Sequence, residues 1–200
     1  MFPYTLTLLR HGDIDHEGRL IGQTDLPAND SGITQMARSW QRLNSLAPVT
    51  SMATSPLQRC REFAVYQALQ AALPLKVDER FAEIDFGDWD GMSLNSLSAQ
   101  HPDWRQALVR HQLVPPGGES YALFRQRVLA GFHDWIAASH GSHRVLVTHG
   151  GVITVLMAEL LGTDFSVAKL MTVQRGGFAQ LSILTGHPAY LMRLEAPEPV

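Results

Sequence analysis

Three short segments of the sequence combine arginine and histidine with small residues, and one chemistry accounts for all three. They are Arg10-His11-Gly12, Ser55-Pro56-Leu57-Gln58-Arg59 and Thr148-His149-Gly150-Gly151. A guanidinium stays charged at any working pH and presents a planar fork of donors that matches a phosphate group. A neutral imidazole can attack phosphorus, and neighbouring cations disfavour its protonated form. The segments therefore predict phosphoryl transfer, with Arg10 and Arg59 binding the phosphate and His11 acting as the nucleophile.

Such a reaction needs two further groups, one to stabilise charge and one to protonate the departing oxygen. We expect His149 to donate a hydrogen bond to a phosphoryl oxygen. For the acid we favour Glu83, which lies among apolar residues in the segment 80–89. Asp85, Asp88 and Asp90 are close enough in sequence to compete for this role. Because arginines and helix N-termini can supply the positive charge, the predicted mechanism needs no metal and no cofactor.

The three segments each follow a short apolar run that predicts a strand. Thr5–Leu9 precedes the first segment, Ser51–Thr54 the second and Arg144–Thr148 the third. In open α/β sheets ligands collect outside the carboxyl ends of the strands, so we expect the three segments to meet at one edge. The segment Ser55-Pro56-Leu57-Gln58 has the capping-box pattern with proline at the first helical position, which places Arg59 in the first turn of a helix.

The remaining apolar patterns complete an alternation of strands and helices. Asn29 is a predicted N-cap for a helix whose apolar residues recur at helical spacing up to Leu43. Helices are also predicted over 120–138 and 152–161, and a closing pair of strands over 178–184 and 190–194. This order favours an α/β fold, a three-layer sandwich with a mostly parallel central sheet flanked by helices and a small helical cap over the strand ends.

Composition indicates one globular domain covering residues 1–200. A formal net charge of −3 provides no basic field for nucleic acid, so we expect a small-molecule partner. The single cysteine, Cys60, excludes an intramolecular disulfide. No signal-type segment and no apolar run near the ~20 residues of a membrane span is present, which favours the cytoplasm and no membrane partner.

Taken in order, the motifs make the chain resemble the histidine phosphatase superfamily, also called the phosphoglycerate-mutase-like family. The family's Arg-His-Gly motif matches residues 10–12 and its Ser-Pro-Leu-x-Arg motif matches 55–59. Its acid-bearing segment matches 83–89 and its late Thr-His-Gly-Gly matches 148–151. The resemblance spans nearly the whole chain and implies a metal-independent phosphomonoesterase that hydrolyses a small phosphorylated metabolite through a phosphohistidine intermediate.

The resemblance also implies particular site residues and an organisation. It implies a single domain in which residues 85–120, approximately, form a cap-like insertion, and a monomer or homodimer. The catalytic residues would be His11, Glu83, His149, Arg10 and Arg59, and the substrate-binding residues Arg10, Arg59, Gly150, Gln23 and Thr24.

Within the family, the segments 22–27 and 86–89 are most similar to alpha-ribazole phosphatases of cobalamin assembly, which suggests alpha-ribazole 5'-phosphate as substrate. A phosphoglycerate-mutase-type phosphotransferase is one alternative. It is disfavoured because the compact segment after the acid offers only Arg105 and Arg110 to hold a second acidic group. A non-catalytic phosphate-binding module is the other, disfavoured because binding alone needs neither a nucleophile nor an acid.

Two features of the sequence depart from this pattern or compete with it. Where family members often place a phosphate-contacting asparagine, the chain has Asp13, Asp15 and Glu17, which would repel phosphate unless they point elsewhere. Asp13-x-Asp15 also resembles the signature of aspartate-nucleophile phosphatases, but it starts well past the strand. Cys60 lacks the Cys-x5-Arg loop of thiol phosphatases, so we interpret it as a buried small side chain.

Overall fold

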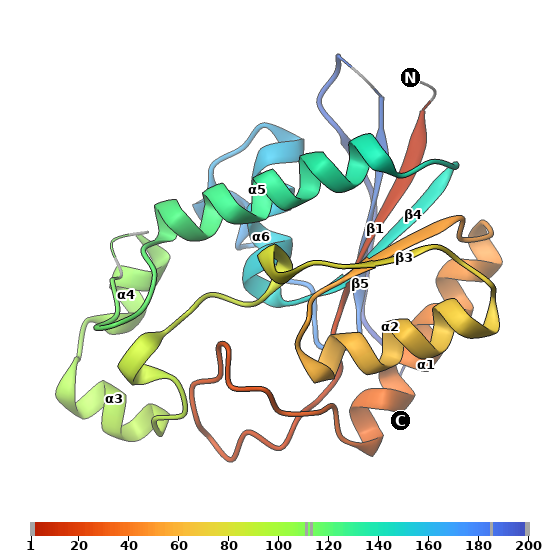
Figure 1. Cartoon of the computed structure of the whole chain (residues 1–200). Helices are drawn as coiled ribbons and strands as arrows, with labels where there is room; N and C mark the ends of the chain where they lie inside the picture. The colour runs from red at the N-terminus through yellow and green to blue at the C-terminus, as the bar shows by residue number, and fades with distance from the viewer. Residues whose placement is uncertain (1–2, 111, 113, 185, 199–200) are drawn as a thin grey trace.

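The structure is a computed structural model that describes residues 3–110, 112, 114–184 and 186–198. A six-stranded sheet runs through the molecule in the order β3-β2-β4-β1-β5-β6 (Figure 1). Neighbours among the first four strands of this order are parallel, whereas β5 and β6 run antiparallel. The strands are β1 (Tyr4–Arg10), β2 (Ser51–Thr54), β3 (Leu75–Val77), β4 (His143–Thr148), β5 (Phe178–Ile183) and β6 (Tyr190–Glu195).

Helices cover both faces of the sheet, and side-chain alternation along the strands decides which core each residue joins. Val145 and Val147 of β4 pack with α1 (Asp30–Leu46) and α2 (Gln58–Gln70). Leu146, between them, packs on the opposite face with α5 (Tyr121–Ala138) and α6 (Gly150–Leu161). The predicted three-layer α/β sandwich with a mostly parallel sheet is therefore confirmed.

Several elements begin where the sequence places them. Asn29 caps α1, because its side-chain oxygen accepts a hydrogen bond from the backbone N–H of Gly32 (2.9 Å). Ser120 caps α5 in the same way. The predicted strand Ser51–Thr54 is β2 without change. These are local signals, in which the capping or apolar residues lie next to the backbone that they organise.

Besides one-residue differences at some strand ends, two helix starts and one short strand differ from the prediction. The helix expected to start at Pro56 begins at Gln58 instead, and the side chain of its N-cap, Leu57, makes no capping hydrogen bond. The carboxylate of Asp25, distant in sequence, accepts from the backbone N–H of Gln58 (2.6 Å) and replaces the predicted capping box. Helix α6 starts at Gly150, two residues before the predicted 152. The three-residue strand β3 was not predicted because its pattern is too short.

The segment between β3 and α5 consists of short helical pieces, and α3 and α4 lie together away from the sheet (Figure 1). Leu97 and Trp104 from this segment join the core formed by α5 and α6. The cap-like role of residues 85–120 stays a prediction, and residues 111 and 113 within it lie outside the described residues. The remaining elements are η1 (Glu79–Phe81), η2 (Gly87–Trp89), α3 (Leu94–Gln100), α4 (Trp104–Val109) and α7 (Phe165–Ala168). No helix among the described residues has the length and apolar character needed to cross a membrane.

Candidate active site

Strand register brings the two predicted catalytic histidines together. In the parallel pairing of β1 with β4, Arg10 lies opposite Thr148, so the residues that follow them are neighbours. The ring centroids of His11 and His149 are 5.2 Å apart. Arg59, at the start of α2, reaches the same place because β2 pairs with the other edge of β4. The expected convergence at the carboxyl ends of three strands is thus observed.

One ring nitrogen of His11 is hydrogen-bonded to the main chain, and the other is available for chemistry. Its Nδ1 lies 2.8 Å from the carbonyl oxygen of Gly12, which can only accept, so Nδ1 carries the proton. The Nε2 lone pair is then available as a nucleophile. Burial, together with the charges of Arg59 and Arg10, holds the pKa of His11 well below its usual range. The imidazole is consequently neutral at neutral pH, as a nucleophile must be.

His149 is fully buried, and its partners define its tautomer. The Nε–H of Arg59 donates to Nδ1 (3.3 Å), so the proton of the neutral ring is on Nε2, which lies 2.6 Å from Ser55 Oγ. Burial first, then the charges of Arg59, His11 and Arg10, hold the pKa of His149 well below its usual range. The Nε2–H of His149 therefore donates to Ser55 Oγ, and the ring lies beside His11.

Arg59 is 1% exposed and is held by main-chain carbonyls. Its Nη1 donates to Thr24 O (2.9 Å) and its Nη2 to Gly22 O (2.5 Å). Together with the bond to His149, these contacts use three of the five N–H donors of a guanidinium and leave two for a ligand. The side chain is therefore locked in direction before any anion binds.

The loop that holds Arg59 is itself organised by Asp90. The Asp90 carboxylate accepts from the backbone N–H groups of Gly22 (3.0 Å), Gln23 (2.7 Å) and Thr24 (2.8 Å), and from the Thr24 hydroxyl (2.9 Å). These bonds fix the loop with its carbonyls toward Arg59. The Gln23 side chain is exposed and donates weakly to Glu83 O (3.3 Å). Substrate binding by Gln23 and Thr24 stays a prediction.

Arg10 combines one protein contact with one unsatisfied donor. Its Nη1 donates to Val173 O (2.9 Å), whereas its Nε is buried and has no hydrogen-bond partner among the described residues. Gly150 allows this approach, because a Cβ there would lie 3.1 Å from the Arg10 guanidinium carbon. Burial lowers the pKa of Arg10, against the opposing effect of Glu83. Arg144 Nε and Ser139 Oγ are also buried without a partner among the described residues, so the open donor of Arg10 indicates a ligand only together with its position in the wall of a cavity.

The Glu83 carboxylate lies at the N-terminus of α6 and lines the same cavity as Arg10. Its Oε2 accepts from the backbone N–H of Gly151 (3.1 Å) and its Oε1 from that of Ile84 (3.0 Å). A Cβ on Gly151 would stand only 2.3 Å from Glu83 Oε1, so the glycine pair serves to admit the Arg10 and Glu83 side chains.

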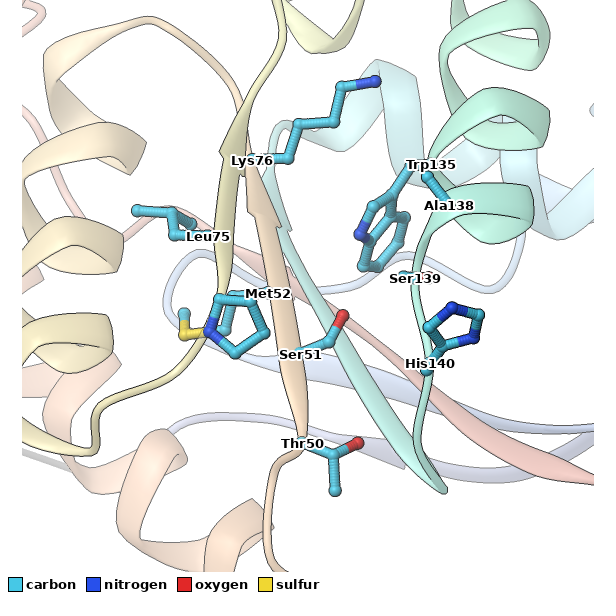
Figure 2. A pocket seen from close by; sticks show the side chains of 10 residues that line it. Thr50, Ser51, Met52, Leu75, Lys76, Trp135, Ala138, Ser139 and His140 are labelled. Atoms are coloured by element: carbon cyan, nitrogen blue, oxygen red, sulfur yellow. The ribbon is translucent and has the colours of Figure 1, made fainter.

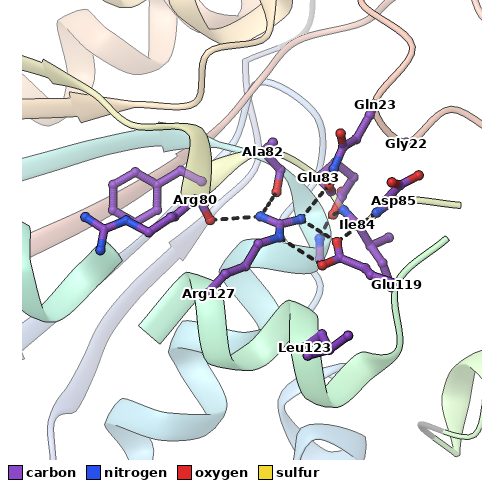
Figure 3. A network of polar contacts seen from close by, with 12 residues as sticks. Gly22, Gln23, Arg80, Ala82, Glu83, Ile84, Asp85, Glu119, Leu123 and Arg127 are labelled. Atoms are coloured by element: carbon purple, nitrogen blue, oxygen red, sulfur yellow. Dashed lines mark hydrogen bonds and ion pairs between the residues drawn. The ribbon is translucent and has the colours of Figure 1, made fainter. Parts of the chain in front are cut away.

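An ion pair that no local sequence pattern predicts holds the Glu83 loop in place. Figure 3 shows the Arg127 guanidinium donating to Arg80 O (2.9 Å), Ala82 O (2.8 Å) and Glu83 O (2.9 Å). The same group forms a fork with the Glu119 carboxylate (2.5 and 3.0 Å). Glu119 also accepts from the backbone N–H of Asp85 (2.9 Å), so this pair fixes the main chain on both sides of Glu83.

The competing carboxylates have other partners. Asp85 accepts from Gly87 N–H (2.8 Å), Asp88 is exposed, and Asp90 belongs to the loop described above. Cys60 is buried, its Sγ lies 3.6 Å from His149 Nε2, and burial raises the pKa of its thiol. Among the four acids of this segment, Glu83 is therefore the one that lines the cavity beside Arg10.

The acidic residues after Gly12 are directed to protein partners. Asp13 Oδ2 accepts from Gln35 Nε2 (2.8 Å), and its Oδ1 lies 3.6 Å from Arg175 Nη1. Asp15 accepts from Asn29 Nδ2 (2.8 Å). The repulsion that the sequence suggests is thus offset, since Arg175 pairs with the nearest acid. Arg175 also contributes to the low pKa of His11, which identifies it as a site-adjacent cation that sequence reasoning missed.

Two cavities lie at opposite ends of the sheet. One, of about 250 Å³, is lined by Arg10, Glu83, Gly150 and Gly151. The other, of about 370 Å³, lies at the amino ends of β2 and β3 and is bordered by the end of α5 (Figure 2). Its cation, Lys76, is paired with Asp78 (3.1 Å). Volume favours the second, but Arg10 and Glu83 line the first, and His11 and His149 are next in the chain to Arg10 and Gly150 of its wall. The first cavity is therefore the candidate active site.

Known proteins resemble this chain in sequence and in fold. A glucosyl-3-phosphoglycerate phosphatase of Mycolicibacterium vanbaalenii is 34% identical over 78% of this chain and 74% of its own length. The structure of the mycobacterial glucosyl-3-phosphoglycerate phosphatase Rv2419c superposes with a TM-score of 0.86 at 26% identity, covering 98% of this chain and all of that one.

An alpha-ribazole phosphatase from Shigella flexneri has the same fold, with a TM-score of 0.83 at 24% identity and coverage of 96% of each chain. Other curated relatives are longer: the chain spans 46% of the bifunctional protein Rv2228c of Mycobacterium tuberculosis, to which it is 31% identical over 82% of its own length. The model of the histidine phosphatase superfamily, branch 1, matches residues 6–193. The chain belongs to that superfamily.

Proposed function

We propose that this chain is a phosphomonoesterase that transfers the phosphoryl group of its substrate to His11 Nε2 and then to water. Homologues that are phosphatases support the coarse activity. The geometry of the described residues supports the route, because Arg10 and the Glu83 carboxyl group line one cavity, and the neutral His11 directly follows Arg10 in the chain and lies against His149, which Arg59 contacts.

One observation carries the proposal, namely the buried Nε–H of Arg10 that has no partner among the described residues. Leaving a buried donor unmade costs about 1–3 kcal/mol, and more for a charged group. A phosphoryl oxygen in the cavity would satisfy it. The two open N–H groups of Arg59 would then serve the other oxygens, and the Nε2–H of His149 would join them by exchanging Ser55 Oγ for a phosphoryl oxygen. Arginine charges here take the place that a metal ion takes in many phosphoryl-transfer sites.

In the first step the His11 Nε2 lone pair forms a bond to phosphorus while the bond from phosphorus to the ester oxygen breaks. The departing oxygen takes its proton from the carboxyl group of Glu83. The charge that develops on the phosphoryl oxygens is stabilised by Arg10, Arg59 and the N–H of His149. The alcohol leaves and the phosphoryl group stays on His11.

In the second step a water molecule attacks the phosphohistidine. Glu83, now a carboxylate, accepts a proton from that water, and the bond between phosphorus and Nε2 breaks. Inorganic phosphate departs, and both His11 and Glu83 regain their starting states. No metal and no cofactor enter either step. For the natural substrate, alpha-ribazole 5'-phosphate stays the candidate that the sequence suggests.

Trapping the intermediate tests this proposal. The protein is mixed with a radiolabelled small phosphomonoester in the presence of EDTA, quenched in denaturant and examined for label bound to protein. We expect label that is lost in acid and kept in alkali, as a phosphohistidine requires. His11→Ala should carry no label, because both ring nitrogens of the neighbouring imidazole, that of His149, have protein partners.

His133→Ala is the matched control, since that histidine is exposed on α5 and remote from the cavity, and it should be labelled like the unaltered protein. Label that persists in His11→Ala would place the nucleophile elsewhere. Turnover that stops in EDTA and returns with a divalent ion would overturn the metal-free mechanism. Transfer of the label to a second acceptor alcohol rather than to water would identify a phosphotransferase.

A further inference from the structure

The cavity at the amino ends of β2 and β3 is larger than the candidate active site and is not part of it. Its volume of about 370 Å³ is within the range of roughly 300–1,000 Å³ that is common for ligand pockets. It lies between these two strands and the end of α5, and Pro74, Ala138 and the Trp135 ring give it apolar walls (Figure 2). The cavity therefore has room for a small ring compound.

Two buried polar side chains in this wall have no partner within the described residues. Ser51 is 3% exposed and Trp135 is 2% exposed, and neither the hydroxyl nor the ring N–H forms a hydrogen bond there. Both polar atoms stay accessible, because the fully covered unpaired atoms are Arg10 Nε, Ser139 Oγ and Arg144 Nε. Figure 2 shows the Ser51 oxygen and the Trp135 ring nitrogen directed at the space between β2 and α5. Polar groups in such a position are normally hydrogen-bonded, so an acceptor in the cavity is needed.

The polar groups around the cavity favour a ligand with acceptor atoms. The Trp135 ring N–H and the Lys76 ammonium group can only donate, and the Ser51 hydroxyl can donate as well. Lys76 shares Asp78 (3.1 Å) with Arg80, which forms a fork to the same carboxylate (2.9 and 2.7 Å). Two cations thus compete for one acid, and no carboxylate is among the described residues that line the cavity. The charge that fits this set of donors is negative.

The partial negative charge expected at the end of α5 is offset by the protein itself. The last carbonyl groups of a helix carry this charge when they have no partner. Here Trp135 O accepts from the backbone N–H of Ser139 (2.8 Å), and Ile136 O accepts from Arg144 Nη1 (3.1 Å). The helix end therefore leaves the donors of the cavity free to attract an anion.

We infer that this cavity is a second binding site, for a small molecule that has a carboxylate on an aromatic ring. The carboxylate oxygens accept from the Trp135 N–H, the Ser51 hydroxyl and Lys76, and the ring lies against Pro74 and Ala138. A carboxylate fits better than a phosphate group, because no arginine fork lines the cavity. The two cavities share no lining residue, so this inference does not depend on the proposed function.

Benzoate and benzylamine test the inference, because they share a ring and differ in the sign of their charge. Each is titrated into protein with nitrogen-15-labelled tryptophan, and the ring N–H resonances are followed by NMR. The resonance of Trp135 is the one that Trp135→Phe removes. We expect benzoate to shift it with a Kd of about 1 mM or tighter, and benzylamine to leave it in place at ten times that concentration. The resonances of Trp40, Trp89 and Trp104 should not move with either probe.

Variants of the cavity wall identify the contacts. Ser51→Ala should raise the Kd of benzoate by about fivefold, the effect of losing one hydrogen bond, and Lys76→Met by about tenfold, because its contact is charge-assisted. Ser139→Ala is the matched control, since its hydroxyl belongs to the same wall but is fully covered, and it should leave the Kd unchanged. A saturating concentration of inorganic phosphate should not displace benzoate.

Four results would overturn the inference. One is a Trp135 resonance that does not move with benzoate, or that moves equally with benzylamine. Another is displacement of benzoate by inorganic phosphate, which would place the probe among the arginines of the candidate active site. The third is an equal rise in Kd for Ser51→Ala and Ser139→Ala, which would indicate a general effect on packing. The fourth is a Trp135 shift that follows the protein concentration instead of the probe, which would show that a second copy of the chain covers the cavity.

Discussion

The two ends of β4 each hold a fully buried histidine, and the protein uses them in different ways. His143 is the first residue of the strand and His149 directly follows its last residue. Burial lowers the pKa of both, so both are neutral rings inside the molecule. What separates them is the set of groups around each ring.

At the amino end both ring nitrogens have partners within the protein. His143 Nδ1 donates to Ala47 O (2.8 Å), and its Nε2 accepts from the Thr7 hydroxyl (2.8 Å). Thr7 in turn accepts from Gln180 Nε2 (3.2 Å), which extends the chain of bonds across three neighbouring strands. No ligand is needed to complete this network, and it serves to join β1, β4 and β5.

At the carboxyl end the polar groups are aligned but not saturated. His149 receives a hydrogen bond from Arg59, and Arg10 nearby keeps a buried N–H without an acceptor among the described residues. Burial of a histidine therefore does not mark a functional site by itself. An arginine donor left open beside it is not sufficient either, because Arg144, next to His143, also has a buried Nε without a partner among the described residues. What distinguishes the carboxyl end is that Arg59 and a second histidine, His11, lie against His149 there.

The largest difference between the two ends should appear in catalysis. His149→Asn should lower kcat/KM for p-nitrophenyl phosphate by about 10²–10³-fold, which is typical of losing one donor to a developing negative charge. His143→Asn should change it by less than about threefold. Steady-state kinetics on both variants tests this, with circular dichroism to establish that each is folded. Similar losses in both variants would show that the ends are not functionally distinct.

The next difference is in stability, where the His143 variant, not the His149 variant, should show the larger loss. His143→Asn shortens the side chain and leaves the Thr7 hydroxyl or the Ala47 carbonyl without its partner, which should cost about 2 kcal/mol or more of the free energy of unfolding. His149→Asn should cost less, because the loss of its hydrogen bonds to Arg59 and Ser55 is partly offset: a ring held among cations for catalysis is not placed for maximal stability. Urea unfolding of both variants gives the comparison. A larger loss for His149→Asn would contradict it.

Local sequence patterns predicted one part of this architecture well. The strands ending at Arg10, Thr54 and Thr148 and the Asn29 cap are set by residues next to one another in the chain. Their common sheet edge then follows from the rule for parallel strands. This is why the sequence alone predicts that His11, Arg59 and His149 lie close together.

The supporting contacts could not be predicted in this way, because their partners are remote in sequence. Asp90 binds a loop 66 to 68 residues away, and Arg127 binds the carbonyl of Glu83 across 44 residues. The sequence also contains His143-Arg144, the same two residue types as Arg10-His11 in reverse order. Only its place at the beginning of a strand, instead of the end, shows that it is structural.

The smallest expected difference concerns how the free energy of unfolding changes at acidic pH. Since the pKa of His143 is lowered in the folded protein, an unfolded chain binds a proton there near pH 6.5 that the folded chain does not. The free energy of unfolding should therefore fall as the pH drops below about 6.5, by at most about 1.4 kcal/mol per pH unit from this group, until the folded pKa is reached. His11 and His149 act in the same direction.

Removing one histidine and adding an anion separates the contributions of the two ends. His143→Asn should lose less stability than the unaltered protein between pH 7.0 and 5.5, by up to about 1.4 kcal/mol, because its own share is gone. Inorganic phosphate bound at the other end favours protonation of His11 and His149, so it should reduce the acid loss in both proteins alike. Urea unfolding at the two pH values, with and without phosphate, measures all four quantities. If the two proteins showed the same pH dependence without phosphate, the pKa of His143 would not be lowered in the folded protein, and the prediction would be wrong.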